Sequence, residues 1–234
     1  MSFGLDPALH EFYADRSSDA AALCGLALAS SGAVAQGRSL LWVRHAMLDH
    51  EQGAPYAPGV DSCGIASSSM ILVRLREEVG VLQAAFEGAR CTGLGAVVVE
   101  LWGEARAYDL TASRRLAMAA RKSGVPVLMA RVAATPAPSA AETRWRVRAM
   151  PSRALAANAP GNPAFAMTLL RARNGQEGQH LHLEWDRDAR TLVTLPAGGS
   201  DGPVIRPAAV SGALGPVSFD RPGAAREHAW RKAG

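Results

Sequence analysis

The sequence predicts an α/β fold: a mostly parallel sheet flanked by helices, with an antiparallel hairpin near its C-terminal end. Apolar runs of strand length alternate with helical patterns up to about residue 131, and several runs are apolar on both faces, as in buried parallel strands. Strictly alternating segments follow. The 234 residues, 48% hydrophobic and 20% charged, suit one packed domain and exclude a large multidomain enzyme.

Five apolar runs in the first part of the chain have the length of a strand. They cover residues 10–14, 39–43, 70–75, 96–102 and 125–131. Helical patterns at 18–30, 78–90 and 111–123 lie between them. This alternation predicts parallel strands joined by right-handed crossovers.

Two of these helices carry clear local signals. Apolar residues on the second repeat at three and four positions and predict one stripe, which consists of Val79, Leu82, Ala85, Phe86 and Ala89. The third helix is expected to begin at Asp109 or Thr111 and to stop at Gly124, because cations followed by glycine are typical of a helix end.

The pattern changes after residue 131. Residues 144–148 alternate basic and apolar side chains, as a half-buried strand does. The runs 164–171 and 180–185 flank a connection that contains Gly175, which predicts a β-hairpin. The sheet extension is therefore expected to be antiparallel.

Composition separates a C-terminal tail from this core. Residues 196–234 hold 5 prolines and 7 glycines in 39 positions, which is typical of flexible segments. We therefore predict a core domain over 1–195 and a flexible tail over 196–234. The positive charge is also uneven, since residues 1–131 hold 12 Lys+Arg against 13 Asp+Glu and residues 132–234 hold 13 against 8.

The turn after the first strand is where a phosphate-binding loop belongs in such a fold. The segment consists of Ala14, Asp15, Arg16, Ser17, Ser18, Asp19, Ala20 and Ala21. A working loop needs glycines, a lysine and a hydroxyl that reaches magnesium. Here no glycine lies between Gly4 and Gly25, and alanine stands where lysine and the hydroxyl are needed. We interpret Asp15 and Asp19 as helix caps and dipole complements.

Other candidates for chemistry are weak. Glu100 ends an apolar strand and is either a ligand for a metal or water, or a solvated or capping group. The histidines and the three cysteines share no metal-type spacing, so we expect no metal site. No apolar run of membrane-spanning length is expected, and the chain is predicted to be cytoplasmic.

Arginine is the remaining candidate, because nearly all the basic residues are guanidinium groups. The predicted partner-binding residues are Arg114, Arg115, Arg144, Arg146, Arg148, Arg171 and Arg173, with Arg226 and Trp230 in the tail. They form either a docking surface for an acidic protein or a nucleic-acid backbone, or a solvated basic face.

Read in order, the segments resemble the recombinase A (RecA) core and, more closely, the ImuA proteins, which are RecA/SulA-related accessory factors of damage-induced mutagenesis. The matching motifs are LHEFY (9–13), YAPGV (56–60), MILVR (70–74), DLTASRRL (109–116), GVP (124–126), PSAA (138–141), TRW (143–145), LRARNG (170–175) and LEWD (183–186). The resemblance covers about residues 5 to 195 and implies a degenerate RecA-like core.

The resemblance also implies a function. ImuA-like proteins act in translesion DNA synthesis during the SOS response, with the inactive Y-family polymerase homologue ImuB and, indirectly, an error-prone DnaE-type polymerase. Association with RecA is also implied, and the chain would join the nucleoid after DNA damage. Because the phosphate loop is degenerate, we expect no catalysis and no cofactor.

Two alternatives share the same core. One is a RecA-like ATPase that uses a nonstandard nucleotide site with Glu100 as its acid. The other is a SulA-like inhibitor of cell division. Direct DNA binding stays open, and a steep salt dependence would be its signature.

Overall fold

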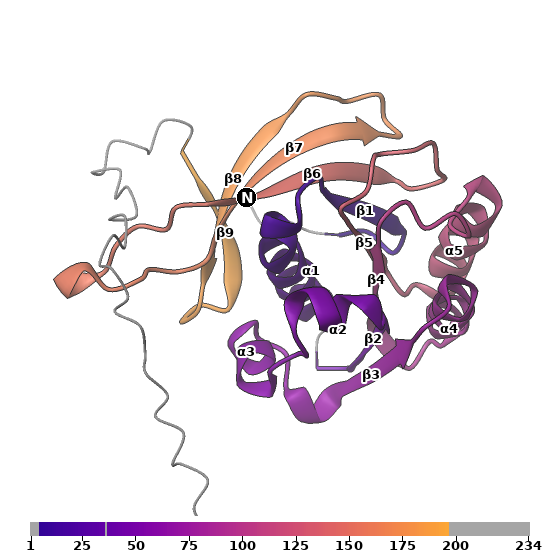
Figure 1. Cartoon of the computed structure of the whole chain (residues 1–234), viewed down its shortest axis with the longest axis horizontal. Coiled ribbons are helices and arrows are strands. Elements are labelled where there is room, and N and C mark those ends of the chain that lie inside the picture. Colours follow the sequence, from indigo (N-terminus) through magenta and orange to yellow (C-terminus); the bar gives the residue numbers. More distant parts are fainter. Residues whose placement is uncertain (1–4, 36, 197–234) are drawn as a thin grey trace, which may run out of the picture. The chain divides into compact units, whose positions relative to one another are not determined.

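The computed structural model describes residues 5–35 and 37–196, which form a nine-stranded sheet of order β3-β2-β4-β5-β1-β6-β7-β8-β9 (Figure 1). The strands are β1 Leu9–Ala14, β2 Ser39–His45, β3 Met70–Leu75, β4 Leu94–Trp102, β5 Val127–Val132, β6 Thr143–Met150, β7 Ala164–Ala172, β8 His180–Asp186 and β9 Thr191–Leu195. Strands β1 to β6 pair in parallel, and β7, β8 and β9 continue the sheet antiparallel to their neighbours.

Helices cover the two faces of the sheet unequally. They are α1 Ala20–Ala35, α2 Met47–Gln52, α3 Ala57–Ser62, α4 Glu78–Arg90 and α5 Leu110–Ser123. The α1 helix lies on one face, and α4 and α5 lie side by side on the other (Figure 1). The four connections that link β1 to β5 in chain order each carry at least one helix, whereas β5 leads to β6 through residues 133–142, which contain none.

Two apolar clusters hold these layers together. The cluster beneath α1 extends from β2 and β4 to the antiparallel strands and includes Phe12, Trp145, Phe165 and Trp185. The cluster beneath α4 and α5 involves mainly β2, β4 and β5. The face of β6 to β9 that is opposite α1 therefore lacks a helical cover within the described residues.

The α1 helix is the apolar centre of the fold. With the 3-10 turn Ser17–Asp19 it forms 19 residues that are long and apolar enough to cross a membrane, so the expectation of no such run was wrong. Half of this segment is buried against protein, because α1 packs on β4, β5 and β6. A Cβ at Gly95 would lie 2.6 Å from the Cα of Ala35, so glycine lets the end of α1 approach β4.

The predicted fold class is confirmed, and its elements are present with shifts of a few residues. Asp109 caps α5 by accepting a hydrogen bond from the amide of Ala112, and Gly124 ends the helix in the left-handed conformation. The β7 to β8 hairpin is present, but β6 pairs in parallel with β1 before the antiparallel extension begins. The short elements α2, α3 and β9 were not predicted. The predicted tail lies outside the described residues apart from Pro196.

Candidate functional site

The turn from β1 to α1 lacks the glycines of a phosphate cradle. Five residues separate Ala14 from Ala20, and three of them form the 3-10 turn Ser17–Asp19. A phosphate-binding loop of this type has glycines that turn backbone amides toward the phosphates. Residues 15–19 contain no glycine.

The two aspartates of the turn bind the neighbouring strand. Asp15 forms an ion pair with Arg146 at 2.8 Å, and Asp19 accepts a hydrogen bond from the Ala149 amide at 3.0 Å. Neither forms a side-chain cap at the helix start, so the interpretation as caps was wrong. Both carboxylates remain at the N-terminal end of α1, where they repel a phosphate.

Glu100 is buried in an ion pair at the carboxyl end of the sheet. Its Oε2 forms an ion pair with Arg44 Nε at 2.8 Å and accepts a hydrogen bond from Trp42 Nε1 at 2.9 Å, and its side chain is 1% exposed. Arg44 and Glu100 are register partners on β2 and β4. Glu100 is therefore neither a solvated nor a capping group. Its carboxylate faces the Arg44 guanidinium, whereas a metal ligand would face a metal ion.

Further contacts hold Arg44 in place. Its Nη1 donates to Asp49 Oδ1 at 2.8 Å and to the Gly53 carbonyl at 3.1 Å, and Asp49 also pairs with Arg74 at 3.1 Å. Burial raises the pKa of Glu100, and the Arg44 guanidinium opposes that shift. Burial and the Glu100 charge raise the pKa of the Cys24 thiol well above its usual value, so Cys24 is a protonated thiol and a poor nucleophile.

A second buried network lies between β1 and β6. Glu11 is fully buried, accepts from Arg144 Nε at 2.8 Å and accepts from the Tyr108 hydroxyl at 2.6 Å. Arg144 also donates to Ser139 Oγ at 2.8 Å. The prediction of Arg144 as a docking residue was wrong, because its guanidinium satisfies a buried carboxylate and is not accessible to a partner.

The other predicted arginines differ in exposure and pairing. Arg146 is half-buried and forms an ion pair with Asp15. Three others are exposed and form no ion pair among the described residues: Arg148, Arg171 and Arg173. The Arg173 amide donates to the Glu142 carbonyl at 2.9 Å, and the Glu142 carboxylate pairs with Arg121 of α5. The end of β7 therefore lies beside the C-terminal end of α5. Arg226 and Trp230 lie outside the described residues.

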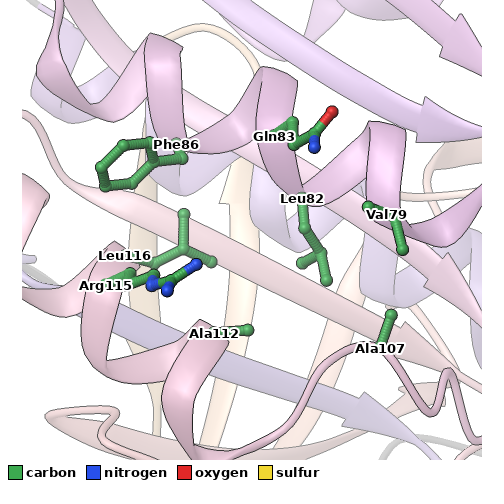
Figure 2. A pocket seen from close by; sticks show the side chains of 8 residues that line it. All are labelled: Val79, Leu82, Gln83, Phe86, Ala107, Ala112, Arg115 and Leu116. Atoms are coloured by element: carbon green, nitrogen blue, oxygen red, sulfur yellow. The ribbon is translucent and has the colours of Figure 1, made fainter.

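Arg114 and Arg115 are exposed on α5, where no carboxylate pairs with them in the described part of the chain. Arg115 borders a hollow of about 400 Å³ between α4 and α5, together with Val79, Leu82 and Phe86 (Figure 2). The predicted α4 stripe is thus divided, since Ala85 and Ala89 are buried against the sheet while Val79 is 56% exposed. In the sequence, the apolar stripe of α4 includes Val79, Leu82 and Phe86 beside the buried Ala85 and Ala89, and this wide stripe was the available signal for the hollow.

The amino-acid sequence is similar to that of a known protein. Over 155 residues the chain is 32% identical to Protein ImuA from two strains of Caulobacter vibrioides, NA1000 / CB15N and ATCC 19089, which covers 61% of this chain. The chain is ImuA-like. The match spans 59% of the length of those relatives. No family model matches the chain.

The fold of this ImuA-like chain also matches a recombinase. The crystal structure of the RadB recombinase superposes with a TM-score of 0.53, covering 82% of this chain and 92% of that one. The two sequences are 14% identical, so the likeness concerns the fold. The RecA-like architecture is therefore present, with a β1 to α1 turn that lacks glycine and a buried ion pair at its carboxyl edge.

Proposed function

We propose that the chain is a non-catalytic adaptor of a damage-induced mutagenic assembly, in which it binds an inactive Y-family polymerase homologue of the ImuB type. In this proposal an error-prone DnaE-type polymerase joins through that homologue, and RecA is a second partner. The similarity to ImuA supports the biological setting, and the RecA-like fold supports descent from a nucleotide-dependent protein.

The residues at the β1 to α1 turn and at the end of β4 are the observation that supports the non-catalytic part of the proposal. The β1 to α1 turn places Asp15 and Asp19 near the position of a phosphate, and Glu100 is neutralised by Arg44 at 2.8 Å. A triphosphate-binding loop needs glycines and a lysine, and the sequence of this turn has neither. A fold without them still offers its outer surfaces to other proteins.

The exposed arginines support the docking part of the proposal. Arg114 and Arg115 lie on α5, while Arg148, Arg171 and Arg173 lie on the antiparallel extension. Exposed guanidinium groups without partners are suited to carboxylates of another protein, because the fork geometry binds them bidentately.

Size-exclusion chromatography of the purified chain mixed with the ImuB-type homologue tests this proposal. We expect co-elution at micromolar concentration, and the double variant Arg114→Glu, Arg115→Glu should weaken the complex. Arg38→Glu is the matched control, because Arg38 is exposed in the α1 to β2 turn, away from α5. Separate elution of the wild-type proteins at micromolar concentration would contradict the adaptor proposal.

A further inference from the structure

An apolar groove runs along the outer face of the helical layer, between α4 and α5. Two hollows of about 400 and 600 Å³ share Phe86 and Arg115, so they form one continuous feature that we call the α4–α5 groove. Leu82, Phe86 and Leu116 line it, and Figure 2 shows their side chains converging between the two helices. From Val79 to Arg90 the groove follows about 16 Å of α4, or three helical turns.

Large apolar side chains beside this groove remain exposed to solvent. Val79 is 56% exposed and Met118 is 71% exposed, and both line the groove. Five other large apolar residues of the described chain are exposed, and none of them lines this groove. A cluster of this kind, rimmed by charged groups, is typical of a binding surface.

The α5 side of the groove carries only positive charge. Helix α5 carries Arg114, Arg115, Arg121 and Lys122, and it contains no aspartate or glutamate. Arg121 is neutralised by Glu142 at 2.7 Å, whereas Arg114, Arg115 and Lys122 form no ion pair within residues 5–35 and 37–196. Across the groove, Arg90 lies 5.5 Å from the centre of the Phe86 ring and forms an ion pair with Glu87 of α4 at 3.3 Å, so the unpaired cations of the rim lie on α5.

We propose that the α4–α5 groove binds an amphipathic, acidic helix of another protein. Apolar residues spaced three and four apart on that helix would fill the two hollows, and aspartates or glutamates on its flanks would pair with Arg114, Arg115 and Lys122. An apolar groove between two helices is a common receptor for such a segment. This inference rests on the groove itself and does not depend on the proposed function.

Charge selects this occupant over two others. A second copy that paired symmetrically through the groove would place the α5 cations of both copies together, which is unfavourable. The segment 197–234 of the same chain carries 5 Lys+Arg and 3 Asp+Glu, so its net charge has the same sign as the rim. A separate acidic partner complements both the apolar floor and the cationic rim.

Fluorescence anisotropy of labelled helical peptides on the full chain tests the proposal. Three peptides of about 18 residues span the groove: one with leucines at helical spacing and glutamates elsewhere, one with lysines replacing the glutamates, and one with serines replacing the leucines. We expect the leucine and glutamate peptide to bind at least about tenfold more tightly than either of the other two, more weakly at high salt. No binding at millimolar peptide, or equal binding of the lysine peptide, would overturn the proposal.

Variants of the full chain then locate the peptide. Met118→Asp and Arg115→Glu should each weaken binding about tenfold, because both side chains are exposed and border the groove. Leu155→Asp is the matched control, since Leu155 is 58% exposed in the connection between β6 and β7. Equal losses in all three variants would overturn the assignment to the groove.

The competing occupants give their own readouts. If the wild-type chain is a dimer that Met118→Asp converts to a monomer, a second copy fills the groove and the proposal fails. If replacing Phe219 and Trp230 with serine raises peptide affinity about tenfold, the chain's own C-terminal segment fills it, and the proposal fails as well.

Discussion

The buried arginines of β2 and β6 and the exposed arginines of α5 have opposite environments. Arg44 and Arg144 are nearly buried, and each lies 2.8 Å from a glutamate that is itself buried. Arg114 and Arg115 are exposed and lack ion pairs among the described residues. Arginine therefore has two roles in this fold: it neutralises buried carboxylates of the sheet, and it leaves positive charge exposed on α5.

The largest expected effect comes from reversing a charge in the buried set. Arg144→Glu places a second carboxylate beside the buried Glu11, and we expect it to lower the free energy of unfolding by more than about 4 kcal/mol. Urea denaturation followed by circular dichroism measures this change. Arg146→Glu is the control on the same strand face, where the pair with Asp15 is about one-third exposed and is worth about 1 kcal/mol or less. Equal losses for the two variants would remove the distinction between buried and exposed pairs.

Removing Arg44 tests the second buried pair. Arg44→Ala leaves Glu100 charged and unpaired in the interior, so the free energy of unfolding should fall by about 3–5 kcal/mol. The double variant Arg44→Met, Glu100→Gln should recover most of this loss, because it removes both charges and keeps an oxygen acceptor for Trp42 Nε1. A loss below about 1 kcal/mol for Arg44→Ala, or no recovery in the double variant, would contradict this account.

An acid-sensitive contribution to stability is expected from His10. Its ring contacts Thr143 Oγ1 at 2.8 Å and the Asp6 carbonyl at 3.0 Å, and burial lowers its pKa below 6.5. Since the unfolded chain then binds the proton more readily, the stability from His10 is complete above pH 6.5 and declines as the pH falls below it, by up to about 1.4 kcal/mol per pH unit. The stability difference between wild type and His10→Gln, measured from pH 7.5 to 5.5, should narrow. A stability difference that stays constant over this pH range would show that the protonation of His10 does not contribute to the acid sensitivity.

The smallest effect is expected on the exposed side of the comparison. Arg114→Glu together with Arg115→Glu should change the free energy of unfolding by about 0.5 kcal/mol or less, because neither side chain has a partner to lose within the described chain. Thermal denaturation provides the measurement. A loss of several kilocalories would show that these arginines stabilise the fold and would withdraw them as free docking groups.

Local patterns were enough to predict the parallel part of the sheet. Runs such as Val97 to Val99 are apolar on both faces because both faces of the sheet are covered there. The end of α5 was also predictable, because two cations followed by Gly124 are typical of a helix that ends in the left-handed conformation. The short strand β9 was missed, since its five residues next to a Pro/Gly-rich segment have no strong period.

The site was harder to predict because its partners are distant in the sequence. In the sequence, Arg144 resembles a surface residue of an alternating strand. Its partner Glu11 lies 133 positions earlier. Glu100 and Trp42 are 58 positions apart and meet only through the register of β2 and β4. The missing glycines and lysine of the β1 to α1 turn were readable directly, because that loss is local.

A titration of the purified chain with ATP and magnesium, followed by thermal denaturation, tests the central claim most directly. We expect no change in melting temperature at any nucleotide concentration, because Asp15 and Asp19 repel phosphate and Glu100 is paired with Arg44. A saturable rise of several degrees would mean that the native state binds the nucleotide, and it would contradict the account.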